Sequence, residues 1–282
     1  MRTNIKNTYD INSSVQYIAD TLIINGTIID CSGLLYGKMG IAIFFMHYFR
    51  HTGITVYENY AADLIKEIQN QIHADMSIGY ERGLSGIGAG IEYLAQNGFL
   101  DESTDEILAD IDNKITTSIK YMCDNHYEPR CEITEKTAKE MSGAGLYLLW
   151  RISNPESGKK ADILKSILKQ VIDFIPPEYS DFNIYNNLIS KTHKLNLYRE
   201  KTTVLIKEFK KPVSRKSYKY ITSLFTDSQN KFIHHINEGG KISHAYSKFN
   251  TEHEMGLIGG MAGIGLYLLS CHYNENTWYS LL

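Results

Sequence analysis

The sequence predicts an all-α protein built from helical hairpins, and three observations lead to this prediction. One glycine-led apolar motif occurs four times along the 282 residues. An amphipathic stretch with helical periodicity follows the first three copies, and no segment shows the sustained alternation of a strand. Proline is scarce, with five in the chain. Repetition at this scale is typical of proteins that stack one supersecondary unit.

The repeated motif is clearest at 143–149 and 263–269, which read GAGLYLL and GIGLYLL. Looser copies begin at Gly40 and Gly86. Three copies open with a Gly-x-x-Gly step: Gly37 to Gly40, Gly83 to Gly86, and Gly260 to Gly263. The four copies are 46, 57 and 120 residues apart. Since the last interval is about twice the others, we expect one further, diverged copy between residues 175 and 240.

Two kinds of helix follow from the pattern after the glycines. Nearly uncharged runs come first, at 41–48, 91–95 and 146–150. Amphipathic stretches come next, at 57–72, 108–119 and 163–175. A helix that is apolar on all sides must be buried, whereas its amphipathic partner can face water. We therefore expect an inner and an outer layer of helices, and closing the hairpins into a ring would remove the exposed ends of an open solenoid.

The motif glycines have a structural and a functional interpretation. Glycine in a helix costs about 0.5–1 kcal/mol relative to alanine, so the motifs need a compensating role. Close approach of the inner helices, with positive φ in the turns before them, would supply one. A site for an anion or a peptide backbone at the helix start is the functional alternative. We favour packing, and expect it for Gly37, Gly40, Gly83, Gly86, Gly143, Gly145, Gly260 and Gly263.

The net charge and the N-terminal sequence limit the classes of protein to which this chain can belong. The net charge is −3, the isoelectric point is about 6.4, and no long Lys/Arg run occurs, so we expect no nucleic-acid partner. The first residues are polar where a signal peptide is apolar, which favours a cytoplasmic protein. Segment 255–274 contains no Asp, Glu, Lys or Arg and is long enough to cross a bilayer. Because the same motif recurs in polar surroundings, we expect a buried helix there and not membrane insertion.

Four segments resemble the lanthionine synthetase C-like family: GLLYGKMGIAIFF at 33–45, GLSGIGAGIEYLAQNGFL at 83–100, SGAGLYLLWRIS at 142–153 and GLIGGMAGIGLYLLS at 256–270. The resemblance implies one α/α toroid domain over 1–282, with an N-terminal segment 1–30 and a divergent region 176–253. Family members typically bind one zinc ion. They close thioether rings on ribosomally made precursor peptides, by adding a cysteine thiol to a dehydrated serine or threonine.

The expected zinc ligands are where this sequence departs from the family. In the family they come from a Trp-Cys-Tyr-Gly-type motif and a later Cys-His-Gly motif, each opening an inner helix. Residues 176–253, where both should lie, contain no cysteine. The sequence therefore predicts a degenerate or absent zinc site, and suggests that a hairpin of a longer toroid was lost or eroded.

Three groups of residues are candidates for substitute zinc ligands. Cys271 and His272 match two letters of the later motif, although Tyr273 follows them. Cys123, His126 and Cys131 have suitable chemistry but lie in a connection between hairpins. The histidines His234, His235, His244 and His253 match no metal-binding spacing. For each group the simpler interpretation is structural: a packed cysteine, a connecting segment and solvated histidines.

Polar residues beside the motif turns are candidates for a catalytic or binding site by position alone. They are Tyr36, Glu81, Arg82 and Glu254. Capping and turn solvation are the simpler interpretation for each. The chain also has 20 tyrosines, several of which could line a peptide groove.

Four functions remain open, and we leave open whether the protein is an enzyme. The favoured one is a peptide-modification protein without the metal centre, which binds a precursor peptide or assists a modification enzyme. The second is a zinc-dependent cyclase with rearranged ligands. The third is a toroid glycoside hydrolase, which needs two carboxylates across a cleft, from Glu81, Glu92 or Glu254. The fourth is a non-catalytic helical scaffold.

Overall fold

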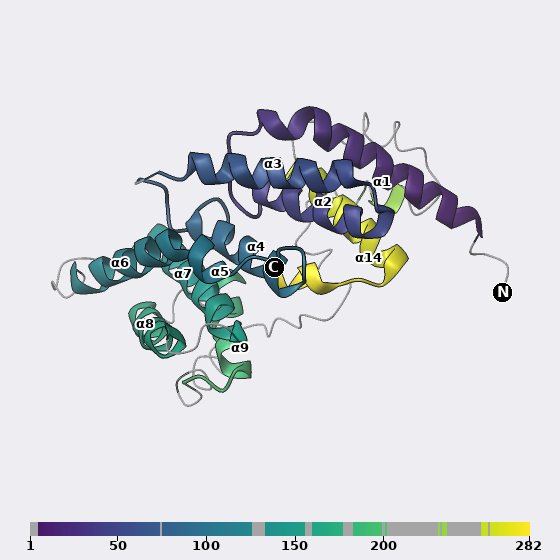
Figure 1. Ribbon diagram of the computed structural model, residues 1–282. Coiled ribbons are helices and arrows are strands. Elements are labelled where there is room, and N and C mark those ends of the chain that lie inside the picture. Colours follow the sequence, from purple (N-terminus) through teal and green to yellow (C-terminus); the bar gives the residue numbers. More distant parts are fainter. Residues whose placement is uncertain are drawn as a thin grey trace. The chain divides into compact units, whose positions relative to one another are not determined.

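The computed structural model describes residues 5–73, 75–125, 133–155, 160–176, 183–198, 201, 231, 233–235, 255–258 and 260–282. Every regular element in these ranges is a helix, which confirms the predicted all-α class (Figure 1). The chain divides into two compact units, Met1–Ile72 with Arg215–Leu282, and His73–Ser214. Whether the two units together form the toroid predicted over 1–282 depends on how they combine, so the toroid stays a prediction.

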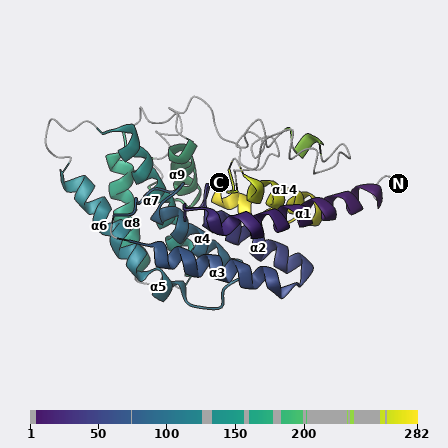
Figure 2. The same ribbon diagram turned by 90° about the horizontal axis from the view of Figure 1, so that it is seen from above.

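The first unit contains the first predicted hairpin. Helices α2 (Lys38–Thr52) and α3 (Thr55–Gln71) form the hairpin, and the turn between them contains Gly53 with φ of 69°. Helix α1 (Ile5–Asn25) packs on α14 (Met261–Tyr273), which also packs on α2 (Figure 2). The 3-10 helices η1 (Gly26–Ile28) and η4 (Thr277–Leu281) follow α1 and α14.

The second unit is built around one central helix. Helix α7 (Glu135–Ser153) packs against α4 (Leu84–Gln96), α8 (Lys160–Phe174) and α9 (Asn183–Lys194). The short α5 (Thr104–Ile107) leads into α6 (Ala109–Asn125), which contacts α4, α7 and α8.

Burial follows the predicted pairing of an inner with an outer helix. Residues 38–48 of α2, 84–94 of α4 and 141–149 of α7 are buried without interruption. In contrast, α3, α6 and α8 each bury one apolar stripe; in α3 it consists of Tyr57, Ala61, Leu64 and Ile68. Burying these surfaces against one another is the main favourable contribution to folding.

The turns before α2, α4 and α14 share one backbone conformation. Their final glycines, Gly37, Gly83 and Gly260, are N-caps with extended φ values of −141°, −115° and −130°. A Cβ at any of them would lie 2.2–2.3 Å from a backbone atom of its own loop. Glycine is thus needed for close approach. The prediction of positive φ in these turns was wrong, since the described glycines with positive φ are Gly53 and Gly98, which follow α2 and α4.

Main-chain hydrogen bonds that span seven residues hold each of these turns. They run from Lys38 N to Cys31 O at 2.9 Å, from Leu84 N to Ser77 O at 2.9 Å, and from Ala262 N to Met255 O at 3.1 Å. In the first unit two turns also touch, because Ile258 N donates to Leu35 O at 2.9 Å. The starts of α2 and α14 therefore lie against each other.

Helix α7 starts differently, which corrects the prediction that a glycine turn opens every inner helix. It begins at Glu135 and is capped by the Thr134 side chain, which accepts a hydrogen bond from Thr137 N at 3.2 Å. Gly143 and Gly145 consequently lie inside the helix. A Cβ on Gly143 would lie 2.7 Å from Tyr80 N, so this glycine lets the turn before α4 rest directly on α7.

Two further predictions concern particular segments. No helix among the described residues is long and apolar enough to cross a membrane. Of the region 175–240, where a diverged repeat is expected, the structure describes α9 and a few other residues. Tyr185, Leu188 and Ile189 of α9 are fully buried, so this helix belongs to the core of the second unit.

Candidate functional site

A cleft of about 560 Å³ opens in the second unit, between the turn before α4 and the first turns of α7. Its lining is Ser77, Gly79, Tyr80, Glu81, Arg82, Gly83, Glu135, Lys136, Lys139, Glu140 and Ile184. We call it the charged cleft. Its volume falls within the range of about 300–1,000 Å³ that is typical of ligand sites. It brings together two residues singled out in the sequence, Glu81 and Arg82.

The loop wall of the charged cleft is fixed to α7. Ser77 Oγ donates to Glu140 Oε1 at 2.8 Å and accepts from Gly79 N at 3.0 Å. Tyr80 is buried, and its backbone rests where Gly143 has no side chain. These contacts mean that the wall exists before any ligand binds, which lowers the entropic cost of binding.

Six charged side chains line the charged cleft, three acidic and three basic. Lys139 pairs with Glu135 across one helical turn, with 2.7 Å between nitrogen and oxygen. Glu81, Arg82 and Lys136 are exposed. Both signs of charge therefore line the cleft beside the aliphatic stems of the same side chains, an environment suited to a ligand with both charged and apolar groups.

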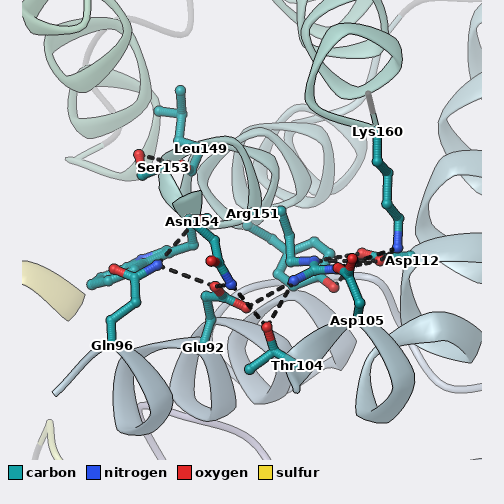
Figure 3. Close-up of polar contacts among 12 residues, drawn as sticks. Glu92, Gln96, Thr104, Asp105, Asp112, Leu149, Arg151, Ser153, Asn154 and Lys160 are labelled. Atoms are coloured by element: carbon teal, nitrogen blue, oxygen red, sulfur yellow. Dashed lines mark hydrogen bonds and ion pairs between the residues drawn. The ribbon is translucent and has the colours of Figure 1, made fainter. Parts of the chain in front are cut away.

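At the other end of the same helices lies an ionic cluster around the buried Arg151 (Figure 3), formed by Glu92, Thr104, Asp105, Asp112, Arg151, Asn154 and Lys160. We call it the Arg151 network. Arg151 and Glu92 are both 0% exposed. The Arg151 guanidinium donates to Glu92 Oε2 at 3.0 Å, to Asp112 Oδ2 at 3.0 Å and to Thr104 Oγ1 at 3.1 Å. It also contacts the Asp105 carboxylate.

The remaining bonds of the Arg151 network satisfy its carboxylates. Asn154 Nδ2 donates to Glu92 Oε1 at 2.6 Å, and Lys160 Nζ lies 2.6 Å from Asp112 Oδ2. Tyr147 donates its hydroxyl proton to Asp112 Oδ1 at 2.5 Å, and burial, reinforced by Asp112, raises the pKa of Tyr147 well above its usual value. The network joins α4 to α8 through paired charges. It is a structural feature, and Glu92 does not face a cleft as a hydrolase carboxylate would.

Sequence reasoning missed Arg151 as an organising residue. The signal was available: Arg151 directly follows the uncharged run 146–150, and an arginine that continues a buried helix needs carboxylate partners. Its partners lie 39–59 residues away in the chain, so the pattern alone could not identify them.

A second cluster closes the carboxyl end of α2 in the first unit. Glu275 Oε1 lies 3.3 Å from His47 Nδ1 and 3.0 Å from Arg50 Nη1, while Glu275 Oε2 lies 2.9 Å from His51 Nε2. The hydrogen bond from His47, together with Arg50, lowers the pKa of Glu275 to about 2 although burial opposes the shift. Burial lowers the pKa of His51, whose ring stacks on Tyr273 at 3.8 Å. These contacts fasten the chain after α14 to α2.

Of the first two groups of candidate zinc ligands, the structure describes Cys271, His272 and Cys123. Cys271 and His272 lie in the last turn of α14, far along the helix from its glycine turn. Cys123 lies near the end of α6, and burial raises the pKa of its thiol, which opposes the thiolate form. His126, Cys131, His244 and His253 lie outside the described residues. No group of three His, Cys, Asp or Glu within the described ranges could hold a metal ion, so these residues do not fit the family's zinc.

The remaining candidates lie in different units or outside the described residues. Tyr36 is half-buried in the turn before α2, in the first unit, whereas Glu81 and Arg82 belong to the second. Glu254 is not among the described residues. His234 and His235 are described, and neither lines the charged cleft.

Comparison with known proteins identifies the family. The model of a family described as lanthionine synthetase C-like protein matches residues 31–201, more than half of the chain. This range includes the glycine turns before α2 and α4, and the whole charged cleft. A search of curated proteins found no match.

Proposed function

Because this chain belongs to the lanthionine synthetase C-like family, we propose that it acts in the modification of ribosomally made peptides. In this role it binds a precursor peptide in the charged cleft, in the cytoplasm, on the toroid expected of the family. The observation that carries the proposal is the cleft itself, preformed at a glycine turn of the family motif and lined by both signs of charge. Zinc chemistry forms no part of it, since the described residues do not supply the ligands.

The character of the cleft favours a peptide over a small apolar ligand. Seven of its eleven lining residues are the six charged side chains and Ser77. Ile184, Tyr80 and the aliphatic stems of the charged side chains supply the apolar part of the surface. A peptide offers backbone amides and charged side chains that can replace the water on such walls, whereas an apolar molecule would leave them desolvated and unpaired.

Hydrogen–deuterium exchange of the full chain tests the proposal. Short synthetic peptides rich in Ser, Thr and Cys, with both acidic and basic residues, serve as probes. We expect slower exchange in residues 77–83 and in the first turns of α7 when peptide is added. Helix α3 provides the control region, because none of its residues lines the cleft. If no peptide at millimolar concentration slows exchange around the cleft, the proposed function is wrong.

A zinc-dependent cyclase would have to draw ligands from residues outside the described ranges, such as His126 and Cys131. Metal analysis of the purified full chain separates it from the accessory role. Stoichiometric zinc that a chelator removes, with loss of ring closure on a dehydrated peptide, would establish the cyclase. In the accessory role we expect a partner enzyme to carry out the chemistry on the bound peptide.

A further inference from the structure

We propose that the charged cleft selects a peptide segment that carries one basic and one acidic group, the basic group bound by Glu81 and the acidic group by Lys136. This inference rests on the proposed function and specifies the chemistry of the ligand.

The other four charged side chains of the cleft already interact within the chain, so Glu81 and Lys136 are the two that remain. Glu135 and Lys139 pair with each other, and Glu140 accepts a hydrogen bond from Ser77. Arg82 also interacts within the chain. Glu81 and Lys136 are exposed, and neither makes a hydrogen bond or ion pair with the part of the chain that the structure describes. They are therefore available to a ligand without first breaking a contact.

Their positions set the orientation of the ligand. Glu81 lies on the loop wall before α4, and Lys136 lies in the first turn of α7, which forms the other wall. The amino end of α7 carries the positive end of the helix dipole, which adds to the attraction of Lys136 for a carboxylate. A lysine or arginine of the peptide would face the loop, and an aspartate, glutamate or terminal carboxylate would face α7.

The ion pairs of the peptide with Glu81 and with Lys136 are both solvated, so they affect selectivity more than total affinity. We expect each pair to change the dissociation constant about two- to fivefold, with a smaller effect at high salt.

A protein–peptide mutant cycle tests the inference with the full chain. The probe is a fluorescent Ser/Thr peptide that contains one lysine and one glutamate, made in both orders, and versions with either charge replaced by glutamine. Glu81→Gln should raise the dissociation constant of the peptide with both charges about two- to fivefold and leave that of the peptide without lysine unchanged. Lys136→Gln should raise the dissociation constant of the peptide with both charges by a similar factor and leave that of the peptide without glutamate unchanged. Fluorescence anisotropy measures the dissociation constants.

Two control variants make the same charge changes elsewhere in the second unit. Glu106→Gln on α5 and Lys120→Gln on α6 alter exposed residues outside the cleft lining and should change no dissociation constant. If Glu81→Gln weakens all peptides equally, or none, while peptides still slow exchange around the cleft, charge selection is wrong and peptide binding stands. If exchange around the cleft does not slow with any peptide, both proposals fail.

Discussion

The two ends of the α4–α7 pair use charge in opposite ways. At the amino end, the charged cleft leaves Glu81 and Lys136 exposed to solvent. At the carboxyl end, Arg151 and Glu92 are buried and every carboxylate of the Arg151 network has a donor. About 22 Å of α7 separates Lys136 from Arg151, from the rise per residue of a helix. The same two helices therefore support an exposed, solvated surface that can bind a ligand and an ionic cluster with a buried centre that joins the helices of the unit.

The difference shows that burial, more than residue type, decides what a charge does here. Glu81 and Glu92 lie eleven residues apart around the same motif, and both looked like candidates for a hydrolase carboxylate. Glu92 is neutralised by a buried guanidinium, whereas Glu81 is hydrated. A buried charge must be paired at all times, so it is poorly suited to exchange partners with a ligand.

The largest effect should come from removing the central cation of the network. Arg151→Met should lower the free energy of unfolding by about 3–5 kcal/mol, because Glu92 and Asp112 would be left as buried charges without their main donor. Urea unfolding of the variant and of the parent protein measures the change. Lys120→Met, an exposed site on α6, controls for loss of a positive charge. A loss below about 1 kcal/mol would mean that the network is hydrated and that the two ends do not differ.

A methyl group in the turn that forms the loop wall should have the next largest effect. Gly83→Ala would place its Cβ 2.2 Å from Ser77 O, which already accepts the Leu84 amide. We expect a loss of about 1–3 kcal/mol in thermal or urea unfolding. Gly79→Ala is the matched control, since its nearest atom is the rotatable Ser77 Oγ at 3.2 Å. Equal losses for the two variants would contradict a role for close backbone approach.

In the first unit, the pH dependence of stability tests how much a paired carboxylate, Glu275, contributes. Glu275→Gln should cost about 1–2 kcal/mol at neutral pH, allowing for partial screening by solvent. The pKa of Glu275 is lowered from 4.5 to about 2, so its contribution is complete above pH 4.5 and is lost as pH falls toward 2. The difference between the melting temperatures of the two proteins should therefore shrink as the pH falls from 4.5 to 3. A difference that grows on acidification would refute the assignment.

The smallest effect is expected at the cleft itself. Glu81→Gln and Lys136→Gln should each change the free energy of unfolding by less than about 0.5 kcal/mol, because both side chains are exposed. Thermal unfolding without peptide measures this. A larger loss in either variant would mean that the residue supports the fold, and it would also weaken the binding experiment.

Local sequence patterns predicted much of the fold. The uncharged run 41–48 and the periodic stretch 57–72 correspond closely to the buried α2 and the amphipathic α3. The start of α7 was missed although Thr134 is a good N-cap residue, because Gly143 and Gly145 were interpreted as marking the start of the helix, whereas they lie inside it. Glycine permits both close backbone approach and positive φ, so the sequence could not tell which of these two properties is needed at Gly83.

The candidate site depended on contacts that the sequence does not encode locally. Glu81 and Arg82 were identified by their position beside a glycine turn, but the opposite wall was not. Lys136 and Glu140 belong to a helix that starts more than fifty residues later. The docking of Ser77 on Glu140 and of Tyr80 on Gly143 brings the two walls together, and only tertiary packing could reveal it.

The main-chain bonding of the glycine turns has a consequence for how this scaffold can change. Main-chain hydrogen bonds and close backbone approach at glycines fix the starts of α2, α4 and α14, and these bonds do not depend on the identity of the side chains between the bonded residues. Just before the caps stand the half-buried Leu35 and Tyr36 in one turn and the exposed Glu81 and Arg82 in another. Other residues can replace the exposed pair without redesign of the helix that follows, which makes this turn a natural place to alter recognition by evolution or by engineering.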